Sequence, residues 1–176
     1  SVITYTNSNG CSNTVTVTVL AQPTITGTLT VCDGSTITLT GSGTPAAVNP
    51  WTSATTSVAT VSNTGVVTGV NPGTSIITYT NSSGCSNTVT VTVLVQPTIT
   101  GTLTVCDGAT TTLSGSGTPA AVNPWTSATT SVATVSNSGV VTGVNPGTSV
   151  ITYTNSNGCS NTVTVIVLAQ PTITGT

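Results

Sequence analysis

The chain has almost no charged side chains. It contains no Lys, no Arg and no His, and its only acidic residues among 176 are Asp33 and Asp107. Nucleic-acid binding needs cations that neutralise phosphates, so nucleic acid is excluded as a partner. Proton-transfer catalysis relies mostly on His or on tuned carboxylates, and soft metals need clusters of His and Cys at ligand spacing. We therefore expect no enzymatic activity, no cofactor and no metal site.

Long apolar runs are also missing. No run approaches the roughly 18 residues that a membrane-spanning helix needs, and no charged segment followed by an apolar one suggests a signal peptide within this stretch. What remains is 36% hydrophobic with a mean hydropathy of +0.37, which argues against disorder. Thr supplies 46 residues, and Val is also abundant. Both are β-branched, so the composition favours strands.

The sequence repeats every 74 residues. Trp51 recurs as Trp125, and residues 1–74 differ from residues 75–148 at seven positions. Residues 1–28 return as 149–176 with one change, Thr18 to Ile166. Both ends of the sequence fall within a repeat unit, which predicts that the chain is a segment of a longer tandem array.

Within a unit the pattern alternates with period two. Residues 88–93 place Val on one face and Thr on the other, which is typical of a half-buried strand. Turn signals rich in Gly, Asn and Asp separate such runs about every ten residues, which predicts a small all-β sandwich. We expect Trp51 and Trp125 to anchor the core, the alternative being exposed Trp side chains that stack on a ligand.

The segment 51–79 carries a family resemblance; it reads WTSATTSVATVSNTGVVTGVNPGTSIITY. It resembles the bacterial group-2 immunoglobulin-like domain, in which a Trp-containing strand is followed by a Val-Ala-Thr-Val strand, a Gly-Val-Val-Thr-Gly hairpin and Gly-Thr-x-x-Ile. The resemblance implies tandem immunoglobulin-like sandwiches of the kind found on bacterial surface proteins and adhesins. Two Cys per unit and the near-absence of charge depart from the family pattern.

These observations predict four segments. Residues 1–20 would be the last two strands of an incomplete repeat, at Val2–Thr6 and 13–20. Residues 21–95 and 96–169 would be complete repeats, and 170–176 the first strand of a following one. The apolar face of residues 1–20 has no opposing sheet in this scheme. We therefore expect it to pair with protein outside the chain.

Cysteines indicate an oxidising, extracellular setting. The disulfide candidates are Cys11, Cys32, Cys85, Cys106 and Cys159. Sequence spacing offers Cys32 with Cys85 and Cys106 with Cys159, within one repeat. In the immunoglobulin-like topology, however, Cys32 and Cys85 lie at opposite ends of a sandwich, too far apart for a bridge. The topology favours Cys32 with Cys159 across the repeat junction, while pairing within a repeat and free thiols stay open.

The other polar candidates are two Asp residues in predicted turns and one Asn in a glycosylation sequon. Asp33 and Asp107 each precede Gly and are predicted turn residues; a Ca²⁺ ion shared at a repeat junction is the alternative. Asn81 begins the sequon Asn-Ser-Ser and is a candidate for N-glycosylation.

O-linked glycans on outward Thr residues would add hydration to a surface with little charge. The outward rows of Thr are also compatible with ice binding. The simpler explanation is that Thr is a soluble strand-forming residue, and the sheets of immunoglobulin-like domains are twisted, whereas ice binding needs a flat face.

Together the patterns predict a structural segment of an extracellular bacterial filament or adhesin stalk. Its partners would be copies of itself, stacked head to tail and paired laterally, because edge strands without Lys or Arg do not resist pairing. The alternative is a carbohydrate- or ligand-binding module of a surface adhesin, with the ligand held by loops such as 43–50.

Overall fold

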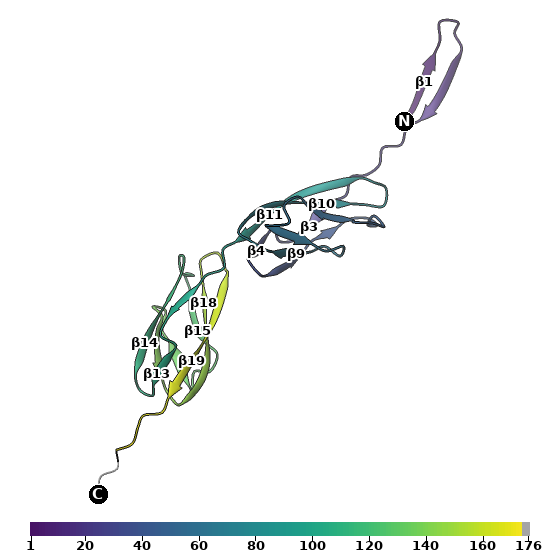
Figure 1. The fold of residues 1–176 in the computed structure, drawn as a ribbon. Coiled ribbons are helices and arrows are strands. Elements are labelled where there is room, and N and C mark those ends of the chain that lie inside the picture. The colour runs from purple at the N-terminus through teal and green to yellow at the C-terminus, as the bar shows by residue number, and fades with distance from the viewer. Residues whose placement is uncertain (174–176) are drawn as a thin grey trace. The chain divides into compact units, whose positions relative to one another are not determined.

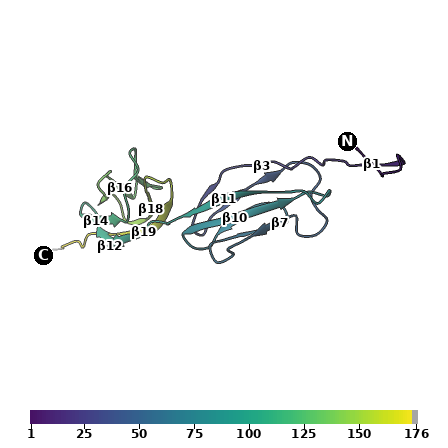
Figure 2. The ribbon, with the colours of Figure 1, turned by 90° about the horizontal axis from the view of Figure 1, so that it is seen from above.

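The computed structural model describes residues 1–173, and their regular structure consists of strands with no helix (Figures 1 and 2). The all-β fold predicted from the sequence is confirmed. The described residues accordingly include no helix with the length and apolarity to cross a membrane. The chain forms two compact units. The first contains Ser1–Val31, Thr36–Val70 and Thr74–Thr92; the second contains Cys32–Ser35, Asn71–Gly73 and the chain from Val93 onward.

The first sandwich is formed by nine short strands. Their bounds are β3 (Ile25–Thr26), β4 (Thr30–Cys32), β5 (Thr36–Thr38), β6 (Thr40–Gly41), β7 (Trp51–Ser53), β8 (Ala59–Val61), β9 (Val66–Gly69), β10 (Gly73–Thr80) and β11 (Ser86–Leu94). One layer is a sheet with the strand order β4-β11-β10-β7, and the other contains the pair β3-β6 and the sheet β5-β9-β8. Its buried residues come from both layers, as expected for an immunoglobulin-like sandwich.

The second sandwich repeats this plan. Its strands are β12 (Ile99–Gly101), β13 (Thr104–Cys106), β14 (Thr110–Gly115), β15 (Trp125–Ser127), β16 (Ala133–Val135), β17 (Val140–Gly143), β18 (Gly147–Thr154) and β19 (Ser160–Leu168). They form two four-stranded sheets, β13-β19-β18-β15 and β12-β14-β17-β16. The core between them is the cluster Val105, Leu113, Trp125, Ala133, Val141, Ile151, Tyr153, Val165 and Val167.

The alternation of Thr and Val explains which faces are buried. On β11 the side chains of Val91 and Val93 are buried, whereas Thr88 and Thr90 are exposed. A strand with this period places its Val side chains on the core and its Thr hydroxyls in water. Thr can therefore solvate the outer surface without charge, and it keeps the χ1 stiffness that favours strands.

The first residues form a separate two-stranded hairpin. Strands β1 (Val2–Thr6) and β2 (Ser12–Thr16) are antiparallel, and every residue in them is exposed. The expected second strand, 13–20, is too long, because β2 ends at Thr16. Val2 pairs with Thr16 and Ser1 exchanges backbone hydrogen bonds with Val17, so β1 has no residue opposite positions 18–20. At the other end of the chain, residues 174–176 of the predicted strand 170–176 lie outside the described residues.

Candidate functional site

An aromatic pair occupies one end of each sandwich core. Trp51 on β7 lies opposite Tyr79 on β10, and their ring centroids are 4.6 Å apart at an interplanar angle of 42°. The hydroxyl of Tyr79 donates a hydrogen bond to the carbonyl oxygen of Gly43, at 3.3 Å. The pair Trp125–Tyr153 has the same centroid distance, 4.6 Å, and an angle of 43°. Both Trp side chains are buried, with 6% and 5% exposed, in the core position expected of them.

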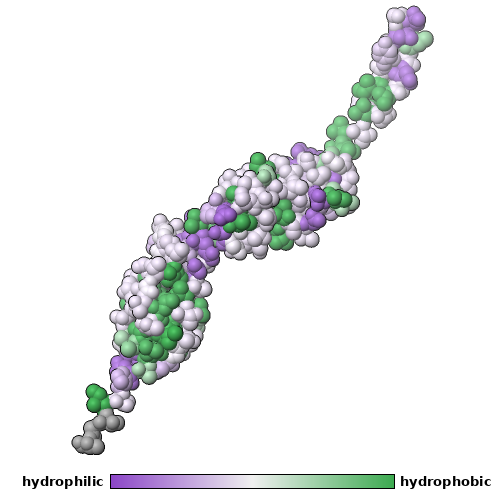
Figure 3. All heavy atoms as spheres, in the orientation of Figure 1, coloured by the Kyte–Doolittle hydropathy of each residue, from purple (hydrophilic) through white to green (hydrophobic). Residues whose placement is uncertain are grey.

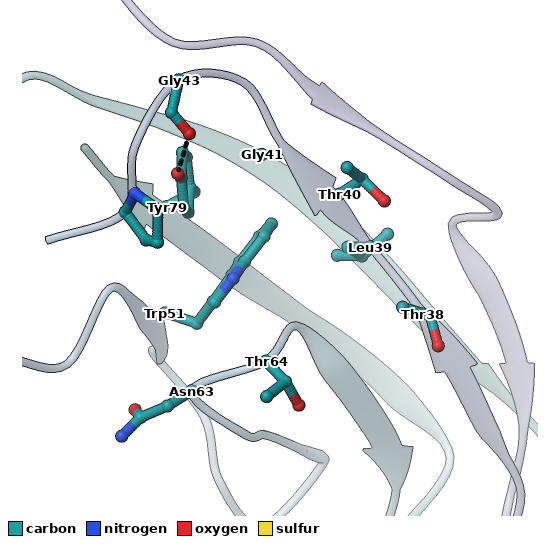
Figure 4. Close-up of a pocket in the computed structure, with 10 residues that line it drawn as sticks. Thr38, Leu39, Thr40, Gly41, Gly43, Trp51, Asn63, Thr64 and Tyr79 are labelled. Atoms are coloured by element: carbon teal, nitrogen blue, oxygen red, sulfur yellow. Dashed lines mark hydrogen bonds between the residues drawn. The ribbon is translucent and has the colours of Figure 1, made fainter.

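A hollow opens beside this pair. In the first sandwich it measures about 320 Å³, and Figure 4 shows the Trp51 indole between Tyr79 and the turn with Asn63 and Thr64. No described residue accepts a hydrogen bond from the indole N–H of Trp51. In the described part of the chain, every fully buried side-chain nitrogen has a hydrogen-bond partner. The indole N–H is therefore not fully buried. The second sandwich has a matching hollow of about 250 Å³, lined by residues at the same repeat positions.

Glycine makes room for the aromatic pair. A β-carbon at Gly41 would overlap the ring of Tyr79. One at Gly65 would overlap the carbonyl oxygen of Leu39 and lie 3.2 Å from the indole of Trp51. The backbone of Gly65 also has a φ of 83°, which L side chains rarely adopt. Sequence reasoning singled out the Trp residues and placed both glycines in turn segments. It did not predict that the glycines lie against the aromatic rings.

The hairpin β1–β2 presents a second candidate surface. Ile3, Tyr5 and Val15 line a hollow of about 250 Å³ on it. Tyr5 is 74% exposed, whereas its repeat equivalents Tyr79 and Tyr153 are 2% and 1% exposed. The same residues that form a core in the complete repeats therefore form an uncovered apolar face here.

One disulfide is present. Cys32, the last residue of β4, is bonded to Cys159, with 5.7 Å between their Cα atoms and 127 residues between them in sequence. Both cysteines lie in the second compact unit. This is the pairing that the topology argument favours over Cys32 with Cys85. Cys11, Cys85 and Cys106 are free.

The remaining polar candidates belong to turns. Asp33 precedes Gly34, whose φ is 75°, and Ser35 donates a backbone hydrogen bond to Cys32 across this turn. The described residues contain no group of three or more His, Cys, Asp or Glu side chains that could hold a metal ion. The side-chain oxygen of Asn81 accepts hydrogen bonds from the backbone of Ser83 and Cys85, so Asn81 shapes its own turn. Glycosylation at Asn81 stays a prediction.

The surface carries hydroxyls in place of charges. Figure 3 shows the visible face of both compact units as mostly pale, the colour of residues with intermediate hydropathy, with separate apolar patches. The described residues bring together no acid–base or nucleophile–base constellation. The arrangement provides aromatic hollows, an apolar hairpin face and free thiols.

Comparison with known proteins identifies the repeat. The family model of the bacterial Ig-like domain (group 2) matches residues 19–93 and 89–167. No curated protein sequence matches the chain.

Several solved structures are similar to the chain. Domains 4 and 5 of the S-layer protein SbsC are 24% identical with a TM-score of 0.38, over 85% of this chain and 98% of that one. A C-terminal intimin fragment, solved in complex with the intimin-binding domain of the translocated intimin receptor, is 21% identical with a TM-score of 0.48, over 83% of this chain and 64% of that one. Invasin, a bacterial integrin-binding protein, is 18% identical with a TM-score of 0.48, over 95% of this chain and 45% of that one.

Proposed function

The chain belongs to the bacterial Ig-like domain (group 2) family, and we propose that it is a structural segment of an extracellular filament or adhesin stalk. In this proposal the repeats stack end to end, and copies of the chain associate with one another without ligand, cofactor or metal. The four predicted segments, 1–20, 21–95, 96–169 and 170–176, are the units of that array.

The observation that carries the proposal is the Cys32–Cys159 disulfide. It joins Cys32, which this proposal assigns to the repeat 21–95, to Cys159, which it assigns to the repeat 96–169. A covalent bond between consecutive repeats, in addition to the peptide linker, restricts how far one repeat can pivot on the next. Restricted pivoting is what a stalk or filament requires. Disulfides also persist in oxidising compartments, which supports an extracellular location.

Self-association is supported by the exposed hairpin face. Ile3, Tyr5 and Val15 are each more than half exposed. The counterparts of Ile3 and Tyr5 in β10 and β18 are buried, and those of Val15 in β11 and β19 are partly buried. An isolated two-stranded hairpin is marginally stable in water, so covering this face with protein lowers the free energy. With a formal net charge of −2 over 176 residues, copies repel one another weakly.

Assembly can be tested with the purified chain in the presence of a thiol reductant that blocks new disulfides. We expect light scattering to rise with protein concentration and electron micrographs to show continuous filaments. Stable monomer at high concentration would overturn the proposal.

A matched pair of variants tests the hairpin face. Ile3→Thr combined with Val15→Thr should weaken assembly, because it removes apolar surface while retaining β-branched side chains. The control, Thr4→Ser with Thr16→Ser, alters the opposite face of the hairpin and should leave assembly unchanged. Equal assembly of both variants would exclude this face as the association surface.

A second function, a binding module for a neutral carbohydrate, is favoured by the two matching hollows. Each combines a Trp edge with hydroxyl or amide side chains and has no charged lining residue. Glycan-array binding that is lost on Asn63→Ala combined with Asn137→Ala would support this function. Absence of any signal would exclude it for the glycans on the array.

Covalent glycans remain part of the proposal. Attachment at Asn81 or at outward Thr residues would raise the masses of the peptides that contain them, in protein isolated from its native source, above the masses of the bare peptides. Peptides with only the bare masses would exclude these glycans.

A further inference from the structure

We propose that Asn9 and Asn157 are sites of spontaneous deamidation, and that the carboxylates formed there weaken self-association of the chain. These two residues begin the only Asn-Gly pairs in the sequence, and they occupy the same repeat position. Weakened association rests on the proposed self-assembly, whereas deamidation takes place within a single chain.

Deamidation of an Asn-Gly pair needs no enzyme, oxidant or reductant. The backbone nitrogen of Gly loses its proton and attacks Cγ of the Asn side chain, ammonia leaves, and a cyclic succinimide remains. Water then opens the ring at either carbonyl and gives aspartate or isoaspartate. A side chain on the residue after Asn would hinder the attack, and Gly has none.

The side-chain amides of Asn9 and Asn157 are free to react. Both residues are exposed, and neither side chain makes a hydrogen bond with another described residue. The glycines that follow, Gly10 and Gly158, both have a φ of 80°, and a β-carbon added at either would meet no described heavy atom within 4 Å. The turn is therefore open around the reacting nitrogen.

Asn155 lies in the same turn as Asn157 and provides the contrast. Its side-chain oxygen accepts hydrogen bonds from the backbone N–H groups of Asn157 and Cys159, and the residue is 6% exposed. Asn7 makes the equivalent bonds in its own turn. Both of these residues are followed by Ser, which hinders the attack. We therefore expect deamidation at the second Asn of each turn and not at the first.

A backbone hydrogen bond sets the rate in the folded chain. The N–H of Gly158 donates to the carbonyl of Asn155 at 3.0 Å, and that of Gly10 donates to the carbonyl of Asn7 at 3.0 Å. This bond must open before the nitrogen can attack, and turns at the ends of hairpins open locally. We therefore expect the folded chain to react more slowly than the same chain unfolded.

The new carboxylates would be large additions to a small charge. Asp33 and Asp107 give the chain a formal net charge of −2, and no Lys, Arg or His is present to neutralise further acids. Conversion at both sites adds two negative charges and brings the net charge to −4. Asn9 also lies between β1 and β2, the hairpin whose apolar face the proposed assembly uses. Like charges on neighbouring copies repel one another, so conversion should weaken association.

The middle copy of the turn is a natural control. Ser83 occupies the position of Asn9 and Asn157, and it is followed by Gly84, whose φ is 79°. A Ser side chain has no carbonyl carbon for the glycine nitrogen to attack, so this turn cannot deamidate. Chymotryptic cleavage after Tyr and Leu gives the three equivalent peptides 6–20, 80–94 and 154–168.

The test is incubation of the purified chain in neutral buffer, followed by reduction, chymotryptic digestion and mass spectrometry. The same chain in guanidinium is the unfolded reference, and a sample digested without incubation gives the starting level. We expect 6–20 and 154–168 to gain the mass difference between an amide and a carboxyl group, faster in guanidinium than in the folded chain. Peptide 80–94 should keep its mass. Fragmentation of the peptides places the change at Asn9 and Asn157.

Two results would overturn the deamidation sites. The first is unchanged peptide masses in the folded chain over a period in which the unfolded chain is converted. The second is conversion mainly at Asn7 or Asn155. Asn9→Ser combined with Asn157→Ser copies the natural turn at Ser83, so this variant should fold and should show no mass gain at either position.

Variants test the effect on association without incubation. Asn9→Asp combined with Asn157→Asp should scatter less light than fresh wild-type chain at equal concentration and low salt, and added salt should reduce the difference. The double Ser variant should match the fresh wild type. Equal scattering by the Asp and Ser variants would overturn the effect on association. Absence of association in every sample would overturn the proposed assembly together with this effect, while the peptide masses decide the deamidation sites independently.

Discussion

Gly115 lies against the ring of Tyr153, and a β-carbon at this position would overlap three ring atoms. Tyr153 is 1% exposed and packs on Trp125, so moving its ring away from a new methyl group would disturb this contact. Gly115→Ala should therefore lower the free energy of unfolding of the second sandwich by about 1–3 kcal/mol. Guanidinium unfolding followed by Trp125 fluorescence, in a Trp51→Phe background, measures the change.

The neighbouring position supplies the control. Ser114 is exposed on the same strand, and Ser114→Ala should change stability by no more than about 0.5 kcal/mol. Equal effects of the two substitutions would show that contact with the Tyr153 ring does not decide the requirement for glycine.

Ser149 is a buried hydroxyl in a small hydrogen-bond network. Its Oγ accepts a hydrogen bond from the backbone N–H of Thr129 at 3.0 Å and lies 2.9 Å from Oγ of Ser127. Ser149→Ala would leave the Thr129 N–H without this acceptor, which should cost about 1–3 kcal/mol in the same unfolding assay. Thr148→Ala, at the exposed neighbouring position, is the control. A Ser149→Ala variant as stable as this control would contradict the network's role.

At the scale of elements, β1–β2 and β18–β19 are nearly the same sequence in two environments. Tyr5 is 74% exposed and Tyr153 is 1% exposed. At protein concentrations too low for association, chymotrypsin should therefore cut after Tyr5 long before it cuts after Tyr79 or Tyr153. Mass spectrometry of the first products checks this order. Simultaneous cleavage at all three sites would mean that the complete sandwiches open as readily as the hairpin.

The sequence predicted the elements well because Thr-Val alternation reports directly on which side of a strand is buried. Residues 88–93 lie within β11 with the expected faces. The end of β2 at Thr16 was not predicted, because pairing partners and not local preference decide where a strand ends. The hydrogen-bond network of Ser149 was not predicted either. A Ser on a strand is expected to face solvent, and its burial becomes evident only when the positions of both sheets are known.

Sequence reasoning predicted only part of the candidate functional site, which comprises the aromatic pair and the cysteines. Trp51 stood out as the single Trp of its repeat, but its contact with Tyr79 depends on the register between β7 and β10. Spacing alone left Cys32 with alternative partners. Choosing Cys159 required knowing at which end of the sandwich each cysteine lies, which is a property of topology.

At the scale of the whole molecule, the disulfide ties residues that are 127 positions apart. Such a link restricts the unfolded chain, so Cys32→Ser combined with Cys159→Ser should lower the free energy of unfolding by about 2–4 kcal/mol. Denaturant unfolding of the double variant measures the loss, with Cys106→Ser as the control that removes a free thiol. A double variant as stable as the control would show that the link constrains orientation without stabilising the fold.

The near-identity of the two hairpins also bears on how the chain reaches its native state. Residues 1–20 and 149–168 differ only at Thr18 and Ile166, so the early hairpin can fill the place of the late one when both are present in an unfolded chain. Near-identical neighbours are prone to such kinetic traps. The trapped isomer would pair Cys32 with Cys11 instead of Cys159, and once oxidised it could not correct itself without reductant. Synthesis from the N-terminus does not avoid this trap, because residues 1–20 are made long before residues 149–168. Oxidation that waits until the second sandwich has closed would avoid it, so we expect the timing of disulfide formation to govern the yield of correctly folded protein.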